Sequence, residues 1–114
     1  MEQEKNHHFQ ATKANEAGAI DWSRTIDVGG EVNAYYGTET KDGGFIICGQ
    51  YYGAASAGRD DILLLKLNMS GEKEWWKLFG GEDYDYARSV VQTDDGGFLI
   101  CGDWGTSDYA KVAL

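Results

Sequence analysis

Clustered carboxylates are the first residues of this chain that could do chemistry. The segment Glu82-Asp83-Tyr84-Asp85 places three acidic side chains within four positions. Hard cations such as Ca²⁺ take carboxylate oxygens, so Asp83 and Asp85 are candidates for a ligand or cation site. The spacing does not match a calcium-binding helix–loop–helix pattern. The chain contains an internal repeat, and the other copy has Glu31-Val32-Asn33 at this place, without equivalent aspartates. We therefore predict a solvated acidic loop without a bound metal.

Aromatic residues near these carboxylates suggest a second kind of site. Tyr36, Tyr52 and Trp104 are expected at strand ends and loops. Aromatic rings beside carboxylates suit stacking on sugar rings or anchoring a protein partner. Packing alone would also explain most of them. The predicted ligand-binding residues are Tyr36, Tyr52, Asp83, Asp85 and Trp104.

Conventional catalytic constellations cannot be assembled from this sequence. His7 and His8 lie near the N-terminus with no partner at metal-ligand spacing, and Gly80-Gly81 follows a strand without a helix after it. No cofactor is predicted, and we expect a protein that is not an enzyme. The alternative is a hydrolase or lyase whose acidic channel forms only in an assembled ring.

Two repeated residue types have structural explanations. Asp42 and Asp95 each precede a Gly-Gly pair, where an aspartate side chain accepts hydrogen bonds from its own turn. Cys48 and Cys101 each lie between an isoleucine and a glycine, and cysteine often acts as a small buried apolar residue. Equivalent positions on neighbouring repeats would be too far apart for a disulfide. We predict two free, buried thiols.

Composition excludes several classes of partner. The 114 residues suit at most one domain, and 10 Lys+Arg against 19 Asp+Glu give a net charge of −9. Such acidity disfavours nucleic acids and anionic membranes, because like charges repel. No apolar run is long enough to span a bilayer, and the polar start lacks the apolar core of a secretory signal.

An internal repeat organises the chain. Asp42-Gly43-Gly44-Phe45 returns 53 residues later as Asp95-Gly96-Gly97-Phe98, and 11 of 32 positions are identical between residues 18–49 and 71–102. A period of this length is typical of repeat architectures. We assign a first repeat to 18–70 and a second, shortened repeat to 71–114. Residues 1–17 form a tail with one strand of an incomplete preceding repeat, Phe9–Ala14.

Each repeat is expected to hold four short antiparallel strands. The Asp-Gly-Gly segments predict β-hairpins, because glycine supplies the positive φ of a tight turn. A further hairpin should join 61–67 to 74–79, and the continuous apolar run 62–65 suits a strand buried on both faces. The fold class is therefore all-β. Four-stranded units of this length favour propeller blades, with an eight-stranded β-sandwich as the competing interpretation.

The combined motif resembles a known family. The segments Glu74–Gly81, Asp83–Val90, Thr93–Phe98 and Asp61–Asn68 resemble the blade repeats of bacterial and archaeal β-propeller repeat proteins. The resemblance implies a β-propeller fold, with residues 89–93 innermost and 75–79 outermost in a blade. It also implies a secreted or surface location, whereas this chain shows no signal peptide. It implies no particular activity, since propellers host many functions.

Two repeats are too few for a closed propeller of the usual 4–8 blades. Uncovered apolar faces favour assembly, so we expect a homo-oligomer in which blades stack in a ring: three copies would give six blades and four would give eight. The strand Phe9–Ala14 could complete a neighbour's sheet by strand addition. We predict a non-enzymatic module for binding or scaffolding, with a glycan or protein as ligand.

Overall fold

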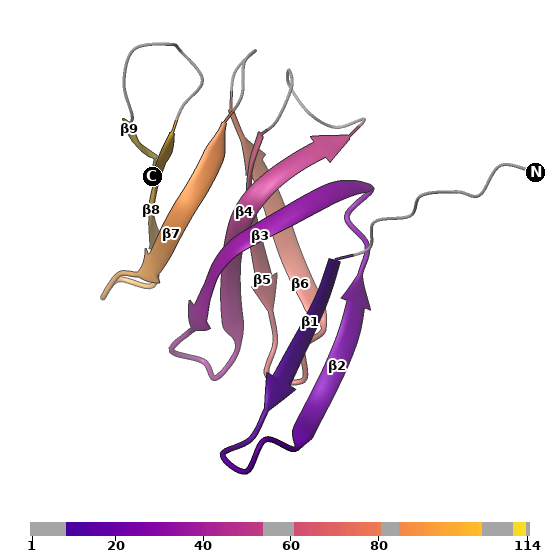
Figure 1. Ribbon diagram of the computed structural model, residues 1–114. Helices are drawn as coiled ribbons and strands as arrows, with labels where there is room; N and C mark the ends of the chain where they lie inside the picture. Colours follow the sequence, from indigo (N-terminus) through magenta and orange to yellow (C-terminus); the bar gives the residue numbers. More distant parts are fainter. Residues whose placement is uncertain (1–8, 54–60, 81–84, 104–110, 114) are drawn as a thin grey trace, which may run out of the picture.

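The computed structural model describes residues 9–53, 61–80, 85–103 and 111–113, and Figure 1 shows their arrangement. These residues form nine β-strands and no helix: β1 (Phe9–Ala14), β2 (Ile20–Ile26), β3 (Gly30–Glu39), β4 (Phe45–Gly53), β5 (Asp61–Leu67), β6 (Lys73–Phe79), β7 (Tyr86–Gln92), β8 (Phe98–Asp103) and β9 (Lys111–Ala113). The predicted all-β class is confirmed. Among these residues, no helix is long and apolar enough to cross a membrane.

The strands form three antiparallel sheets. The central sheet has the order β3-β4-β5-β6, and smaller sheets β1-β2 and β7-β8-β9 lie on its two sides (Figure 1). All of the predicted hairpins are present, including the one that joins β5 to β6. The central sheet crosses the repeat boundary at residue 70, because its edge strand β6 comes from the second repeat. The three sheets do not close into a ring within the described part of one chain.

The structure repeats at the same interval as the sequence. Adding 53 to the bounds of β2 gives the bounds of β6, and the starts of β4 and β8, Phe45 and Phe98, are also 53 residues apart. The β-bulges coincide as well: β1–β2 shifts register after Lys13 and β5–β6 after Lys66. Bulges are specific features of a strand pair. The small sheets therefore correspond to parts of the central sheet, with β1-β2 matching β5-β6 and β7-β8 matching β3-β4.

Strand β5 forms the centre of the packing, and all seven of its residues are buried. Ile62 and Leu64 pack in a cluster with residues of β7 and β8. Leu63 and Leu65, on the opposite face, pack in a second cluster that includes residues of β1 and β2. The prediction of a strand buried on both faces is confirmed, and three sheets rather than two are stacked through it.

Equivalent aromatic pairs join neighbouring sheets. Trp22 of β2 meets Phe45 of β4 edge to face, with ring centroids 5.6 Å apart. Trp75 of β6 meets Phe98 of β8 in the same way, at 5.9 Å. Both partners in the second pair lie 53 residues after those in the first. The two sheet-to-sheet contacts thus use the same side chains in the same geometry.

The two cysteines differ in exposure despite their equivalent positions. Both are free, and Cys48 is buried in the cluster between the central sheet and β7-β8, whereas Cys101 is exposed. The prediction of a buried thiol is therefore wrong for Cys101. The reason is that no described sheet covers the face of β8 that corresponds to the covered face of β4. Burial raises the pKa of the Cys48 thiol to about 11.

Candidate functional site

The aspartate of each Asp-Gly-Gly turn accepts hydrogen bonds from its own turn. Asp42 Oδ1 accepts from the Thr40 hydroxyl at 2.6 Å and from the Gly44 amide at 2.9 Å. Gly43 supplies the positive φ, 84°, that the turn requires. The Gly43 amide also donates to the Thr40 carbonyl. The predicted structural role of Asp42 is confirmed.

The second copy of the turn has the same contacts. Asp95 Oδ1 accepts from the Thr93 hydroxyl and from the Gly97 amide, the latter at 2.9 Å. These two hydrogen bonds lower the pKa of Asp95. The side chain of Asp95 is therefore committed to the turn, as predicted.

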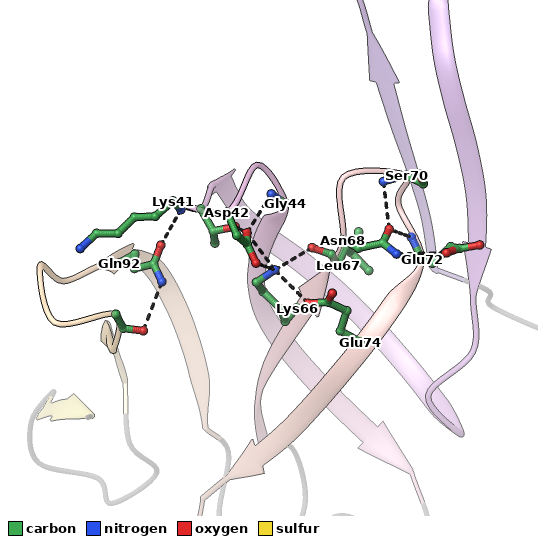
Figure 2. A network of polar contacts seen from close by, with 12 residues as sticks. Lys41, Asp42, Gly44, Lys66, Leu67, Asn68, Ser70, Glu72, Glu74 and Gln92 are labelled. Carbon is green, nitrogen blue, oxygen red and sulfur yellow. Dashed lines mark hydrogen bonds and ion pairs between the residues drawn. The ribbon is translucent and has the colours of Figure 1, made fainter.

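A buried lysine connects the first turn to the outer strands. Figure 2 shows Lys66 of β5 with its ammonium between Asp42 and Glu74. The Nζ atom lies 3.1 Å from Asp42 Oδ2 and 3.1 Å from Glu74 Oε1, and it donates to the Leu67 carbonyl at 3.0 Å. Lys66 is only 5% exposed, while both carboxylates reach solvent. We call Asp42, Lys66 and Glu74 the lysine triad.

The protonation states of the lysine triad are held by its own contacts. Hydrogen bonds from Thr40, Gly44 and Lys66 lower the pKa of Asp42 to about 2. Burial acts to lower the pKa of Lys66, but hydrogen bonds to Glu74 and Asp42 outweigh burial and raise it. Both groups are charged at neutral pH. The opposite charges therefore hold the turn at Asp42 against β5 and β6.

A second turn type lies beside the lysine triad at the same end of the sheets. Asn68 Oδ1 accepts from the Ser70 and Glu72 amides at 2.9 Å (Figure 2). Asn15, 53 residues earlier, accepts from the Ala17 and Ala19 amides in the same way. The turns are thus organised by repeated side chains. Hydrogen-bonded turns therefore occupy this end of the sheets.

Only part of the lysine triad is present in the flanking sheets. Lys13 corresponds to Lys66, and its Nζ lies 2.8 Å from Asp21 of β2, which corresponds to Glu74. Asp95 corresponds to Asp42. Among the described residues, Lys13 pairs with no second carboxylate, and Asp95 forms no ion pair. Lys13 lies on one side of the central sheet, and Asp95, the carboxylate that corresponds to Asp42, lies on the other side.

The predicted ligand residues Tyr36 and Tyr52 are exposed but are not brought together. Tyr36 on β3 is 46% exposed, and Tyr52 on β4 is 57% exposed. Tyr52 pairs with Glu31 and Tyr36 pairs with Cys48. Five positions on β3 separate Glu31 from Tyr36, about 16 Å at the usual rise of a strand. The two rings therefore belong to different parts of the surface.

The remaining predicted ligand residues have different outcomes. Asp83 and Trp104 lie outside the described residues. Asp85 is fully buried, so the expectation of a solvated acidic side chain is wrong at this position. Asp85 and Asp61 approach the same point beside Gly80, since a Cβ atom built there would lie 2.4 Å from Asp85 Oδ2 and 2.7 Å from Asp61 Oδ1. Asp85 thus packs inside, near the start of β7, and its predicted role in ligand binding stays a prediction.

The described residues hold no group of three or more His, Cys, Asp or Glu side chains that could bind a metal ion. The pair formed by Asp61 and Asp85 therefore does not extend to a three-carboxylate site within that part of the chain. His7 and His8 lie outside it. The prediction that no cofactor is bound remains a prediction.

A groove of about 370 Å³ lies between β1 and the central sheet. Ala11 and Trp22 line one wall, and Gly37, Phe45 and Ile47 line the other. Most of this lining is apolar. The lining includes four consecutive residues of β1, from Ala11 to Ala14.

Sequence reasoning missed the lysine triad. The repeat already paired Lys13 with Lys66, which was a usable signal, but a lysine in an apolar run reads as a solvent-facing residue. Its carboxylate partners lie 24 residues before it and 8 residues after it. Only the pairing of β5 with both β4 and β6 brings them together.

Comparison with known proteins gives no assignment. Neither the protein-family models nor the curated proteins contain a match to this chain.

Proposed function

We propose that the chain is a non-enzymatic β-propeller repeat module for binding or scaffolding, completed by self-assembly into a ring. The observation that supports this most is the repeated sheet-to-sheet contact, Trp22 on Phe45 and Trp75 on Phe98. Sheets that meet in the same way at each step follow a constant rotation, which is the principle of a propeller. The central sheet is then one blade, with β3 innermost and β6 outermost.

The unequal flanking sheets support assembly. The β1-β2 sheet has the two outer strands of a blade, and the β7-β8-β9 sheet has the inner strands. Each copy contributes one full blade and shares another with its neighbour. Three or four copies would give a closed ring of six or eight blades, within the roughly 4–8 that propellers adopt.

A glycan or a protein is the proposed ligand class. Tyr35, Tyr36 and Tyr52 are all exposed on the central sheet, and exposed tyrosines provide both stacking area and a hydroxyl for hydrogen bonding. The polar groups of the lysine triad already bind one another, which leaves these exposed tyrosines, as separate contact points, the better candidates for recognition.

Sedimentation of the wild-type chain at micromolar concentration tests the assembly. A mass of three or four chains supports the proposal, and a stable folded monomer would overturn it. A glycan array with wild type and Trp104→Ala tests the ligand class. Loss of a wild-type signal in the variant supports glycan recognition, and equal signals would exclude a role for Trp104.

A further inference from the structure

The two flanking sheets have strands and faces that complement one another: β1 is an edge strand, and β8 is paired with β7 and, at three positions, with β9. They lie on opposite sides of the central sheet (Figure 1), so β1 cannot reach β8 of its own chain. We propose that β1 of one copy pairs antiparallel with β8 of a second copy, in the register that β5 uses on β4. This inference rests on the proposed ring assembly and specifies the interface that joins its copies.

The internal repeat gives the register. Within the central sheet, Cys48 pairs with Leu64. The equivalent positions are Cys101 on β8 and Ala11 on β1. The proposed pairing therefore places Cys101 of one copy opposite Ala11 of the next, and Leu99 opposite Lys13. A strand added at a sheet edge gains its backbone hydrogen bonds in this way.

The same register completes the lysine triad across the two copies. Lys13 already binds Asp21, as Lys66 binds Glu74. Asp95 already has the turn geometry of Asp42, with the Thr93 and Gly97 contacts in place. Pairing β1 with β8 brings the ammonium of Lys13 to the carboxylate of the neighbour's Asp95. The charges are opposite, so the contact favours this register over its alternatives.

The faces beside these edges also match. On the outer face of β7-β8, Val91 is 52% exposed and Cys101 is exposed. The corresponding face of the central sheet is covered by the next sheet, with Ile46 and Cys48 fully buried. The groove beside β1, lined by Gly37 and Ile47, is the surface that would receive the neighbour's face.

Strand β9 occupies part of the proposed docking edge. It pairs with β8 at three positions, opposite Ile100, Cys101 and Gly102. Strand β1 has six residues and β5 makes seven pairs with β4. The docking of β1 therefore requires β9 to leave β8. The three pairs between β8 and β9 are then replaced by a longer ladder between β8 and β1 of the second copy. Each copy presents one β1 edge and one β8 edge, so the contact is head to tail and can close into a ring.

Cysteine cross-linking tests the register directly. Residues opposite one another in antiparallel strands have Cα atoms about 4.5–5.5 Å apart, within the range of a disulfide. The variant Ala11→Cys, oxidised with copper phenanthroline, should form a ladder of disulfide-linked dimers and larger species that reducing agent removes. The native Cys48 thiol is buried and should not take part.

Two matched controls make the result specific. In Ala11→Cys/Cys101→Ser the ladder should be lost, because the partner thiol is absent. In Thr12→Cys the new thiol points to the other face of β1 and should not form the ladder, because alternate residues face opposite sides of a strand. A ladder of equal strength in either control would overturn the proposed register. An oligomeric mass with no ladder in Ala11→Cys would also overturn the register while leaving the ring assembly intact, and a folded monomer would contradict both.

Discussion

Replacement of Lys66 by methionine isolates the contribution of the lysine triad to stability. Methionine has nearly the same volume as lysine and is one atom shorter, because it lacks the ammonium. Asp42 and Glu74 both reach solvent, so the loss of each ion pair should cost only about 0.5 kcal/mol. The Leu67 carbonyl loses a hydrogen bond, which should cost about 1 kcal/mol more. We expect Lys66→Met to reduce the free energy of unfolding by about 2 kcal/mol.

Lys13→Met is the matched control at the equivalent position. In the unassembled chain Lys13 has a single ion pair, and 39% of its side chain is exposed. An exposed pair of this kind contributes about 0–1 kcal/mol, so this variant should lose less than 1 kcal/mol. Urea unfolding followed by tryptophan fluorescence, at one protein concentration low enough to keep the chain unassembled, measures both variants.

Unchanged stability of Lys66→Met would contradict a stabilising role for the lysine triad. A buried ion pair replaced by an apolar side chain of similar volume can leave a protein equally stable or more stable. If Lys66→Met unfolds at the same urea concentration as wild type, or at a higher one, the lysine triad does not stabilise the fold. Equal losses in Lys66→Met and Lys13→Met would show that burial of the ammonium is irrelevant.

Three further predictions follow from single features of the structure. In the unassembled chain a thiol reagent should label Cys101 quickly and Cys48 slowly, because Cys48 is buried and its pKa is raised to about 11. The labelling rates are measured by absorbance. Equal rates for the two thiols would contradict the burial of Cys48. The pKa of Asp42 is lowered from 3.8 to about 2, so its carboxylate stabilises the fold above pH 3.8 and loses that contribution as the pH falls from 3.8 towards 2. Acid unfolding of Asp42→Asn should lack this component, and an unchanged pH profile would exclude it. Gly71→Ala should lower the stability of the protein more than Gly18→Ala. Both glycines have positive φ, but only a Cβ atom at Gly71 would meet an indole ring, that of Trp22 at 2.5 Å. Equal unfolding midpoints of the two variants would contradict this packing.

Much of the fold follows from local chemistry that is visible in the sequence. The Asp-Gly-Gly and Asn turns act over a few residues, so their hairpins could be predicted. The apolar run of β5 indicated burial on both faces for the same reason, because it has no polar alternation. The 53-residue period then related one hairpin to the next.

The errors concern properties that depend on neighbouring sheets. The burial of Cys48 comes from β7 and β8, and no described sheet covers Cys101 in the same way. Asp85 lies in an acidic segment that suggested solvent exposure, yet its side chain is buried beside Gly80. Local sequence patterns do not show these contacts. Sequence reasoning therefore predicted the strands and turns better than the exposure of individual side chains.

The candidate site was the least predictable part. Tyr36 and Tyr52 are exposed, but their pairing partners place them apart on the central sheet. Side chains from different strands form a binding surface only when the sheets pack together. The period of the sequence gives no information on which aromatic rings then share one side of that surface.

The mass of the wild-type chain in solution shows whether the chain assembles into a ring. Sedimentation equilibrium across a range of micromolar concentrations requires no substitution and no knowledge of the ligand. We predict a discrete species of three or four chains, because the flanking sheets of each copy complete those of its neighbours. A folded, stable monomer at every concentration would contradict it.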